Sequence, residues 1–138
     1  MGKTLTVTTL LIVAAGFAPA AIAAESAATG VDPRVYFDAS IEGVRLYDDG
    51  KYEEAYPHLK LAAEKGFKRA QVRLGGLYLY GLGIARSDLK GLAWIGTAAR
   101  DSNDEEITTL FDSIWSKVPP NAAPQITEVI DQYVERYG

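Results

Sequence analysis

The sequence contains no cysteine and a single histidine, His58. Without cysteine the chain can form no disulfide bond and has neither a thiol nucleophile nor a thiolate metal ligand. A Ser-His-Asp arrangement would have to use His58, and no spacing of side chains around this residue matches a metal site. We therefore expect a protein that is not an enzyme, with no catalytic residue, no metal and no cofactor.

Basic side chains are outnumbered by acidic ones. The chain has 18 Asp and Glu residues against 14 Lys and Arg residues, which gives a formal net charge of −4. Proteins that bind nucleic acid rely on Lys and Arg to neutralise phosphates. The composition therefore argues against a nucleic-acid partner.

Long apolar runs are absent except near the N-terminus. A basic start, Met1-Gly2-Lys3, precedes a mostly apolar stretch from Leu5 to Ala18. Thr8, Thr9 and Gly16 interrupt this stretch, which is shorter than the roughly 20 apolar residues of a membrane-spanning helix. The pattern favours a signal peptide over a membrane anchor, which is the alternative.

The residues that follow predict where this leader ends. Ala21-Ile22-Ala23 has the small-x-small form of a signal-peptidase site. We expect residues 1–23 to be a signal peptide, cleaved after Ala23 or, as an alternative, after Ala24. Residues 24–32 would form a flexible mature N-terminus. The mature protein would be exported to the bacterial periplasm, or secreted, and would keep no stable membrane span.

Small side chains recur at a near-constant interval in the rest of the chain. The pairs Ala62-Ala63 and Ala98-Ala99 lie about 36 residues apart, a period typical of helical repeats. Ala70, Leu74 and Leu77 follow the i, i+4, i+7 spacing of one helical face. Inside this predicted helix lie two adjacent glycines, at positions 75 and 76, each of which costs about 1 kcal/mol relative to Ala. A neighbouring helix that approaches the backbone closely would explain why they are there.

Turn and capping residues in the sequence predict where the helices begin and end. Glycine turns and capping residues predict helix pairs at 33–48 with 52–64 and at 68–80 with 88–100, and Pro57 should kink the second helix or loosen its first turn. Asn103 with Glu106 predicts the start of a helix that runs to about residue 117. Pro124 then begins a final helix. We expect an all-α fold over residues 33–138, a short α-solenoid of antiparallel helix pairs, about two and a half repeats, with a C-terminal capping helix.

The second copy of the repeat resembles a Sel-one-like repeat, a relative of the tetratricopeptide repeat. The residues that carry the resemblance are Ala70-Gln71, Leu74-Gly75, Tyr78, Gly81-x-Gly83-Ile84, Lys90, Trp94 and Ala98-Ala99. Ser87 and Gly91 are mild departures, because Asp and Ala are usual there. The first copy follows the more general tetratricopeptide spacing at Gly43, Leu46, Gly50, Tyr52, Ala55, Leu59 and Ala62. The resemblance implies that the first helix of each pair, the A helix, lines a concave binding face.

This implied concave face supplies the candidate site. Arg69 and Arg73 lie one turn apart at the start of an A helix and could receive a carboxylate. Tyr47 and Tyr80 lie near the ends of two A helices and would rim a groove for an extended peptide. The candidate groove residues are therefore Tyr47, Asp48, Arg69, Arg73 and Tyr80. A solvated basic face and ordinary core packing remain the alternatives.

The resemblance implies an adaptor or scaffold in the bacterial envelope that binds a partner protein or peptide through this face. Two other functions stay open. The protein could be a small structural envelope protein that self-associates, because so few repeats gain stability from oligomerisation. It could also be a hydrolase of cell-wall or lactam substrates, although the sequence contains no nucleophile and base pair for that chemistry.

Overall fold

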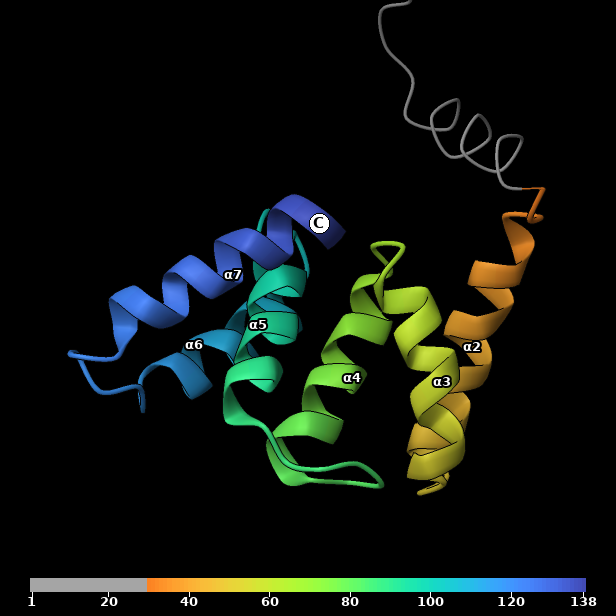
Figure 1. The fold of residues 1–138 in the computed structure, drawn as a ribbon, viewed down its shortest axis with the longest axis horizontal. Helices are drawn as coiled ribbons and strands as arrows, with labels where there is room; N and C mark the ends of the chain where they lie inside the picture. The colour runs from red at the N-terminus through yellow and green to blue at the C-terminus, as the bar shows by residue number, and fades with distance from the viewer. Residues whose placement is uncertain (1–29) are drawn as a thin grey trace, which may run out of the picture. The chain divides into compact units, whose positions relative to one another are not determined.

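Helices alone form the secondary structure of residues 30–138, the part of the chain that the computed structural model describes (Figure 1). The elements are α2 (Arg34–Asp48), α3 (Tyr52–Ala63), α4 (Lys68–Tyr80), α5 (Asp88–Ala99), α6 (Glu105–Trp115) and α7 (Ala123–Tyr137). They belong to one compact unit, Arg34–Gly138. The predicted signal peptide and most of the segment predicted for residues 24–32 lie outside the described residues.

Successive helices pack as hairpins that stack in series, as the repeat pattern predicts. α2 packs against α3, α4 packs against α5, and α3 joins the two pairs through its contact with α4 (Figure 1). The A helices α2 and α4 also touch each other, and α6 follows as the A helix of a third, incomplete repeat. The expected all-α solenoid is confirmed. None of the helices from residue 30 onward is both long and apolar enough to cross a membrane.

The glycines inside helices mark the closest approaches between paired helices. A Cβ added at Gly75 would lie 2.5 Å from Cγ1 of Ile95 and 2.9 Å from the carbonyl oxygen of Gly91. A Cβ at Gly43 would lie 2.9 Å from the backbone nitrogen of Leu59 in the first pair. The predicted reason for glycine, a neighbouring backbone at short range, is therefore confirmed for Gly75. It is wrong for Gly76, where an added Cβ would instead lie 2.8 Å from the side-chain hydroxyl of Tyr47.

Turn residues adopt the conformations that the sequence predicts. Gly66, Gly81 and Gly83 have positive φ angles of 86°, 62° and 69°, and a side chain would strain each of these turns. Ser87 caps α5, since its hydroxyl accepts a hydrogen bond from the backbone N–H of Lys90 at 3.3 Å. Pro57 lies inside α3, which nevertheless runs without interruption from Tyr52 to Ala63.

The predicted starts of α6 and α7 are off by one residue: α7 begins at Ala123 and not at Pro124, and the N-cap of α6 also differs. α6 begins at Glu105, and its N-cap is Asp104 in place of Asn103. The Asp104 carboxylate accepts a hydrogen bond of 3.0 Å from the N–H of Glu106, and the hydroxyl of Ser102 accepts one from the N–H of Asp104. A carboxylate directly before the first turn satisfies a free N–H and suits the positive end of the helix dipole. The neighbouring asparagine is left outside the helix.

The final helix, α7, covers the second repeat. Ile130 packs against Gly96 of α5, where an added Cβ would lie 2.8 Å from the Ile130 side chain. The ring of Trp94 contacts those of Tyr133 and Tyr137, at centroid distances of 5.2 Å and 4.9 Å, and the two tyrosine rings lie 5.6 Å from each other. The expected capping helix is present, and its aromatic end closes the main core of the unit.

Candidate functional site

Four positions of α4 share one face of that helix. Arg69, Arg73, Gly76 and Tyr80 follow one another at steps of four, three and four residues, which places them in a row about 16 Å long at 1.5 Å rise per residue. Ala70, Leu74 and Leu77, each one position after a member of the row, are buried in the core. Within the row, Gly76 is buried beside the Tyr47 hydroxyl, whereas Arg69 and Tyr80 are exposed.

This row borders a groove formed by the three A helices. One hollow, about 230 Å³ in volume, lies among α2, α4 and α6, and it is lined by Val44, Asp48, Arg69, Val72, Arg73, Asp104, Glu106, Ile107 and Leu110. A second hollow of about 650 Å³ lies beside it and is lined by Phe37, Ser40, Ile41, Val44, Arg45, Asp48, Asp49, Phe67, Lys68 and Arg69. The two share Val44, Asp48 and Arg69. We call them together the A-helix groove.

Apolar side chains on the floor of the A-helix groove are open to solvent, among charged side chains that line both hollows. Phe37 and Ile41, one turn apart on α2, are 55% and 56% exposed, and Leu110 of α6 is 37% exposed. Covering such a side chain completely stabilises a complex by about 1.5–3 kcal/mol. A row of exposed apolar side chains within a hollow is a feature of protein interaction sites.

Arg73 is held by other residues of the groove. Its guanidinium lies 3.3 Å from the Asp48 carboxylate and stacks over the Tyr47 ring at 5.2 Å. Its Nε atom is buried and has no hydrogen-bond partner. Arg73 therefore joins α4 to α2 and is partly withdrawn from solvent.

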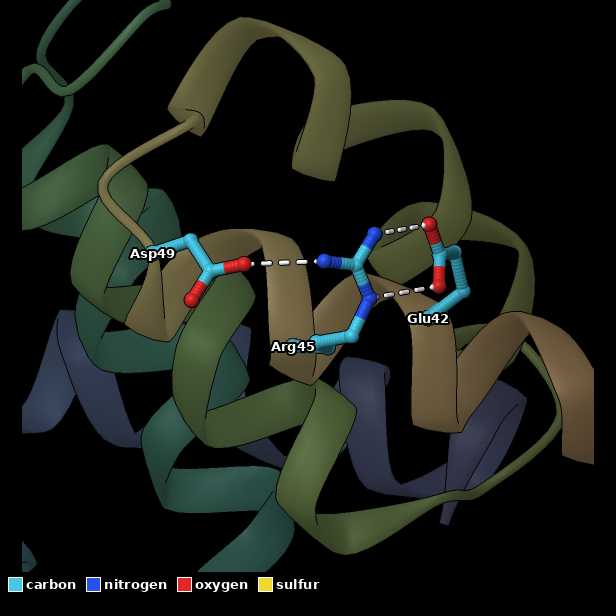
Figure 2. Close-up of polar contacts among 3 residues, drawn as sticks. All are labelled: Glu42, Arg45 and Asp49. Atoms are coloured by element: carbon cyan, nitrogen blue, oxygen red, sulfur yellow. Dashed lines mark hydrogen bonds and ion pairs between the residues drawn. The ribbon is translucent and has the colours of Figure 1, made fainter.

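Arg45, at the rim of the larger hollow, is also paired within the chain. Figure 2 shows its guanidinium between the carboxylates of Glu42 and Asp49. Nε and one terminal nitrogen donate to Glu42 at 2.9 Å and 2.6 Å, and the other terminal nitrogen donates to Asp49 at 2.8 Å. The hydrogen bonds from Arg45 lower the pKa of the Glu42 carboxyl. The guanidinium of Arg45 is therefore already paired with two carboxylates of its own helix and the turn that follows.

Arg69 differs from these two arginines. It is exposed, it lines both hollows, and within residues 30–138 no ion pair or hydrogen bond holds its guanidinium. The nearby Lys68 instead donates to the carbonyl oxygens of Ala98 and Arg100, each at 3.1 Å. Arg69 is thus the groove cation that is available to a carboxylate from outside the chain.

The structure brings most of the predicted groove residues together. Tyr47, Asp48 and Arg73 form one contact group, and Arg69 lies in the same groove. Tyr47 is half-buried, with its hydroxyl 2.8 Å from where a Cβ on Gly76 would lie, and burial raises its pKa. Tyr80 stands at the far end of the row, 69% exposed. Their roles in binding stay predictions.

The apolar residues of the groove were not predicted from the sequence. Ile41, Val44, Val72, Ile107 and Leu110 line it, and none of them was expected there. A signal existed: Phe37, Ile41 and Val44 follow helical spacing on α2, on a different face from the core residues Ala39, Gly43 and Leu46. A second apolar face on an A helix indicates a surface that something else covers.

His58 lies half-buried on α3, away from the A-helix groove. No hydrogen bond joins it to a serine or threonine in the described part of the chain. Residues 30–138 also contain no group of three or more His, Asp or Glu side chains placed to hold a metal ion. The expectation of a protein without enzymatic activity stays a prediction.

Comparison with known proteins identifies the fold. No protein-family model and no curated protein matches this chain. Among solved structures, it is similar to a protective antigen present in uropathogenic Escherichia coli strains, which displays an SLR fold, the Sel-one-like repeat fold. The two are 29% identical with a TM-score of 0.59, over 68% of this chain and 21% of that one, so this chain spans about a fifth of the antigen's length. The helical unit therefore has the Sel-one-like repeat fold, as the motifs of its second repeat predicted.

Proposed function

We propose that this protein is an interaction module of the bacterial envelope, which binds a partner protein or peptide in its A-helix groove. The observation that carries the proposal is the combination of an exposed apolar floor with an arginine that has no ion pair in the described part of the chain. Phe37 and Ile41 would supply most of the apolar contact. Arg69 would meet a carboxylate of the partner, a pairing that fixes orientation and excludes partners of the wrong charge.

The dimensions of the groove suit a partner segment that is an extended peptide or one face of a helix. The two hollows together follow the A helices from Phe37 to Leu110 and are joined at Arg69. Grooves of this kind recognise a partner through a few apolar anchors, with polar contacts at the rim. Tyr80, whose ring is mostly exposed at one end of the row, would provide such a rim contact.

The envelope location belongs to the proposal as well. Its support is the basic start, the short apolar stretch and the Ala21-Ile22-Ala23 site in the sequence. Expression of the full chain in a bacterial host, followed by fractionation and mass spectrometry of the N-terminus, tests it. We expect a periplasmic or secreted product that begins at residue 24 or 25, and an unprocessed chain in the cytoplasm would contradict it.

Charge reversal at Arg69 tests the binding role. Affinity capture from envelope extract with wild type and with Arg69→Glu should recover a specific partner with wild type alone. The matched control, Arg136→Glu, places one new acidic side chain on α7, away from the groove, and should capture as wild type does. Equal recovery by wild type and Arg69→Glu would contradict the groove as the binding site. We prefer Arg69 to Arg73 for this test because reversal of Arg73 would place a carboxylate beside Asp48.

A further inference from the structure

The third A helix lacks the partner that the other two A helices have. α2 packs along α3 and α4 packs along α5, but α7, the helix that follows α6, packs against α5 instead (Figure 1). α6 and α7 both rest on α5 and do not form a third closely packed pair. In a stacked repeat, a face left without its neighbour is an open apolar surface.

The third A helix carries a large side chain where the second has glycine. Gly43 and Gly75 let α3 and α5 approach closely, at Leu59 and Ile95. A step of 36 residues, the interval between Leu59 and Ile95, leads from Gly75 to Phe111 on α6. A phenyl ring at this position would hold a following helix further from the backbone of α6 than glycine would.

The space between the two helices is a hollow with an aromatic wall. It has a volume of about 450 Å³, and its lining includes Gly96, Thr108, Phe111, Trp115, Thr127 and Ile130. We call it the α6–α7 slot. Phe111 and Trp115 are half-buried and stack with their ring centroids 5.5 Å apart and an interplanar angle of 27°. The slot shares no lining residue with the A-helix groove.

The charges that line the α6–α7 slot are unbalanced. Arg100 is the one basic residue of the lining, and its guanidinium donates to Asp131 of α7. Asp101 and Asp112 also line the slot, and neither has an ion pair among residues 30–138. Asp101 follows Arg100, the C-cap of α5, and has a φ of 55°, in the left-handed region. The slot therefore presents two carboxylates next to two stacked aromatic rings.

We propose that the α6–α7 slot binds a basic amphipathic helix of a partner protein. An apolar side chain of that helix would enter the hollow against Phe111 and Ile130. An Arg or Lys one turn away would lie over the Trp115 ring and reach the Asp112 carboxylate. Aromatic faces attract cations, and a carboxylate beside the ring strengthens this preference. An acidic segment would meet repulsion from Asp101 and Asp112.

Two observations favour a helix as the occupant. The missing neighbour of α6 is itself a helix in the two complete repeats, so a helix edge completes the existing packing pattern. The hollow is too small for an entire helix, whose diameter with side chains is about 10–12 Å. One face of a helix, with an apolar and a basic side chain at i and i+4, is what the aromatic wall and the carboxylates together accommodate.

A displayed library of random 16-residue peptides, selected on the full chain, tests the proposal. The same selection on Trp115→Ala identifies the peptides that depend on the slot. We expect slot-dependent peptides, and we expect them to be enriched in Arg or Lys three or four positions from a large apolar residue. Slot-dependent peptides without such basic residues would overturn the proposal, and so would the absence of slot-dependent peptides.

Substitution of Asp112, which leaves Phe111 and Trp115 in place, tests the proposed cation contact. Binding of one enriched peptide to the full chain should weaken about two- to fivefold in Asp112→Asn, the effect of an exposed ion pair. It should be unchanged in the control Asp38→Asn, an exposed position on α2. Unchanged binding in Asp112→Asn would overturn the assigned cation contact. Dimers of the full chain that dissociate in Trp115→Ala would identify a second copy as the occupant and overturn the proposal of a partner helix.

Discussion

The side-chain amide of Gln71 donates a hydrogen bond of 2.9 Å to the main-chain carbonyl of Tyr137, 66 residues further along the chain. The same nitrogen donates to the carbonyl of Ala63 at 3.1 Å. Gln71 is 1% exposed, at the junction of the two repeats. One buried amide thus joins the end of α3, the start of α4 and the end of the capping helix.

Replacement of Gln71 by leucine should destabilise the fold. Gln71→Leu keeps side-chain bulk but removes this donor. The carbonyl of Ala63 still accepts a hydrogen bond of 3.1 Å from the N–H of Gly66, whereas the carbonyl of Tyr137 loses its bond to Gln71, and an unsatisfied buried polar group costs about 1–3 kcal/mol. Urea unfolding followed by circular dichroism measures the loss. The control Gln125→Leu, at an exposed position of α7, should change the free energy of unfolding by less than about 0.5 kcal/mol. Equal stability of Gln71→Leu and wild type would show that this junction is unimportant.

A methyl group at Gly75 should also destabilise the protein. Alanine favours a helix over glycine by about 1 kcal/mol, but its Cβ would collide with Ile95 and with the carbonyl of Gly91. Overpacking of this kind typically costs about 1–3 kcal/mol, so Gly75→Ala should lower the free energy of unfolding. The double variant with Ile95→Ala should lose less than the two single losses added together, because one of the clashes is removed. A Gly75→Ala protein more stable than wild type would contradict the close approach of α4 and α5.

Stability should fall at high pH because of partly buried tyrosines. Burial, reinforced by a 3.2 Å hydrogen bond with the Tyr56 hydroxyl, raises the pKa of Tyr78 above its ordinary value of 10.0. The unfolded chain loses this proton above about pH 10 while the folded chain keeps it, so the free energy of unfolding decreases as pH rises through this range. Burial also raises the pKa of Tyr133.

Urea titrations between pH 8 and pH 11.5 measure this dependence. Tyr78→Phe removes the titrating hydroxyl, so its free energy of unfolding should decline less steeply above pH 10 than that of wild type. Parallel declines in the two proteins would assign the alkaline effect to other groups.

The sequence predicts the repeat geometry well because that geometry is local. Glycine and small-residue positions such as Gly75 and Gly91 lie on adjacent helices joined by a short turn, and their spacing alone shows that two backbones approach. Ser87 is a cap for the same reason, since its partner lies three residues away. The start of α6 was misplaced by one residue because Asn103 and Asp104 are both good capping residues.

Features that depend on distant parts of the chain were not predictable in the same way. α7 packs on α5 through contacts such as that of Ile130 with Gly96. The spacing of apolar residues along α7 does not identify the helix against which it packs. In the groove, Tyr47, Asp48 and Arg73 were expected, but their mutual pairing was not. That pairing distinguishes Arg73 from Arg69, which the sequence presents as equivalent.

Replacement of the two arginines of α4 should have different effects on the free energy of unfolding. Arg73→Ala removes a cation–π contact with Tyr47 and an exposed ion pair with Asp48, which together amount to about 1 kcal/mol. Arg69→Ala removes no ion pair and should lie within about 0.5 kcal/mol of wild type. Thermal and urea unfolding of the two variants compare them directly, and the reverse order of stabilities would refute the assigned roles.

Site-specific photocrosslinking in living cells tests the groove most directly. A photoreactive amino acid at Ile41, on the apolar floor of the A-helix groove, is compared with one at Leu61, an exposed position on α3 that lines neither hollow. We predict one discrete adduct with an identifiable protein at Ile41, its loss in the Arg69→Glu background, and no such adduct at Leu61. The same adduct from both positions, or an Ile41 adduct that Arg69→Glu leaves unchanged, would contradict binding through the A-helix groove.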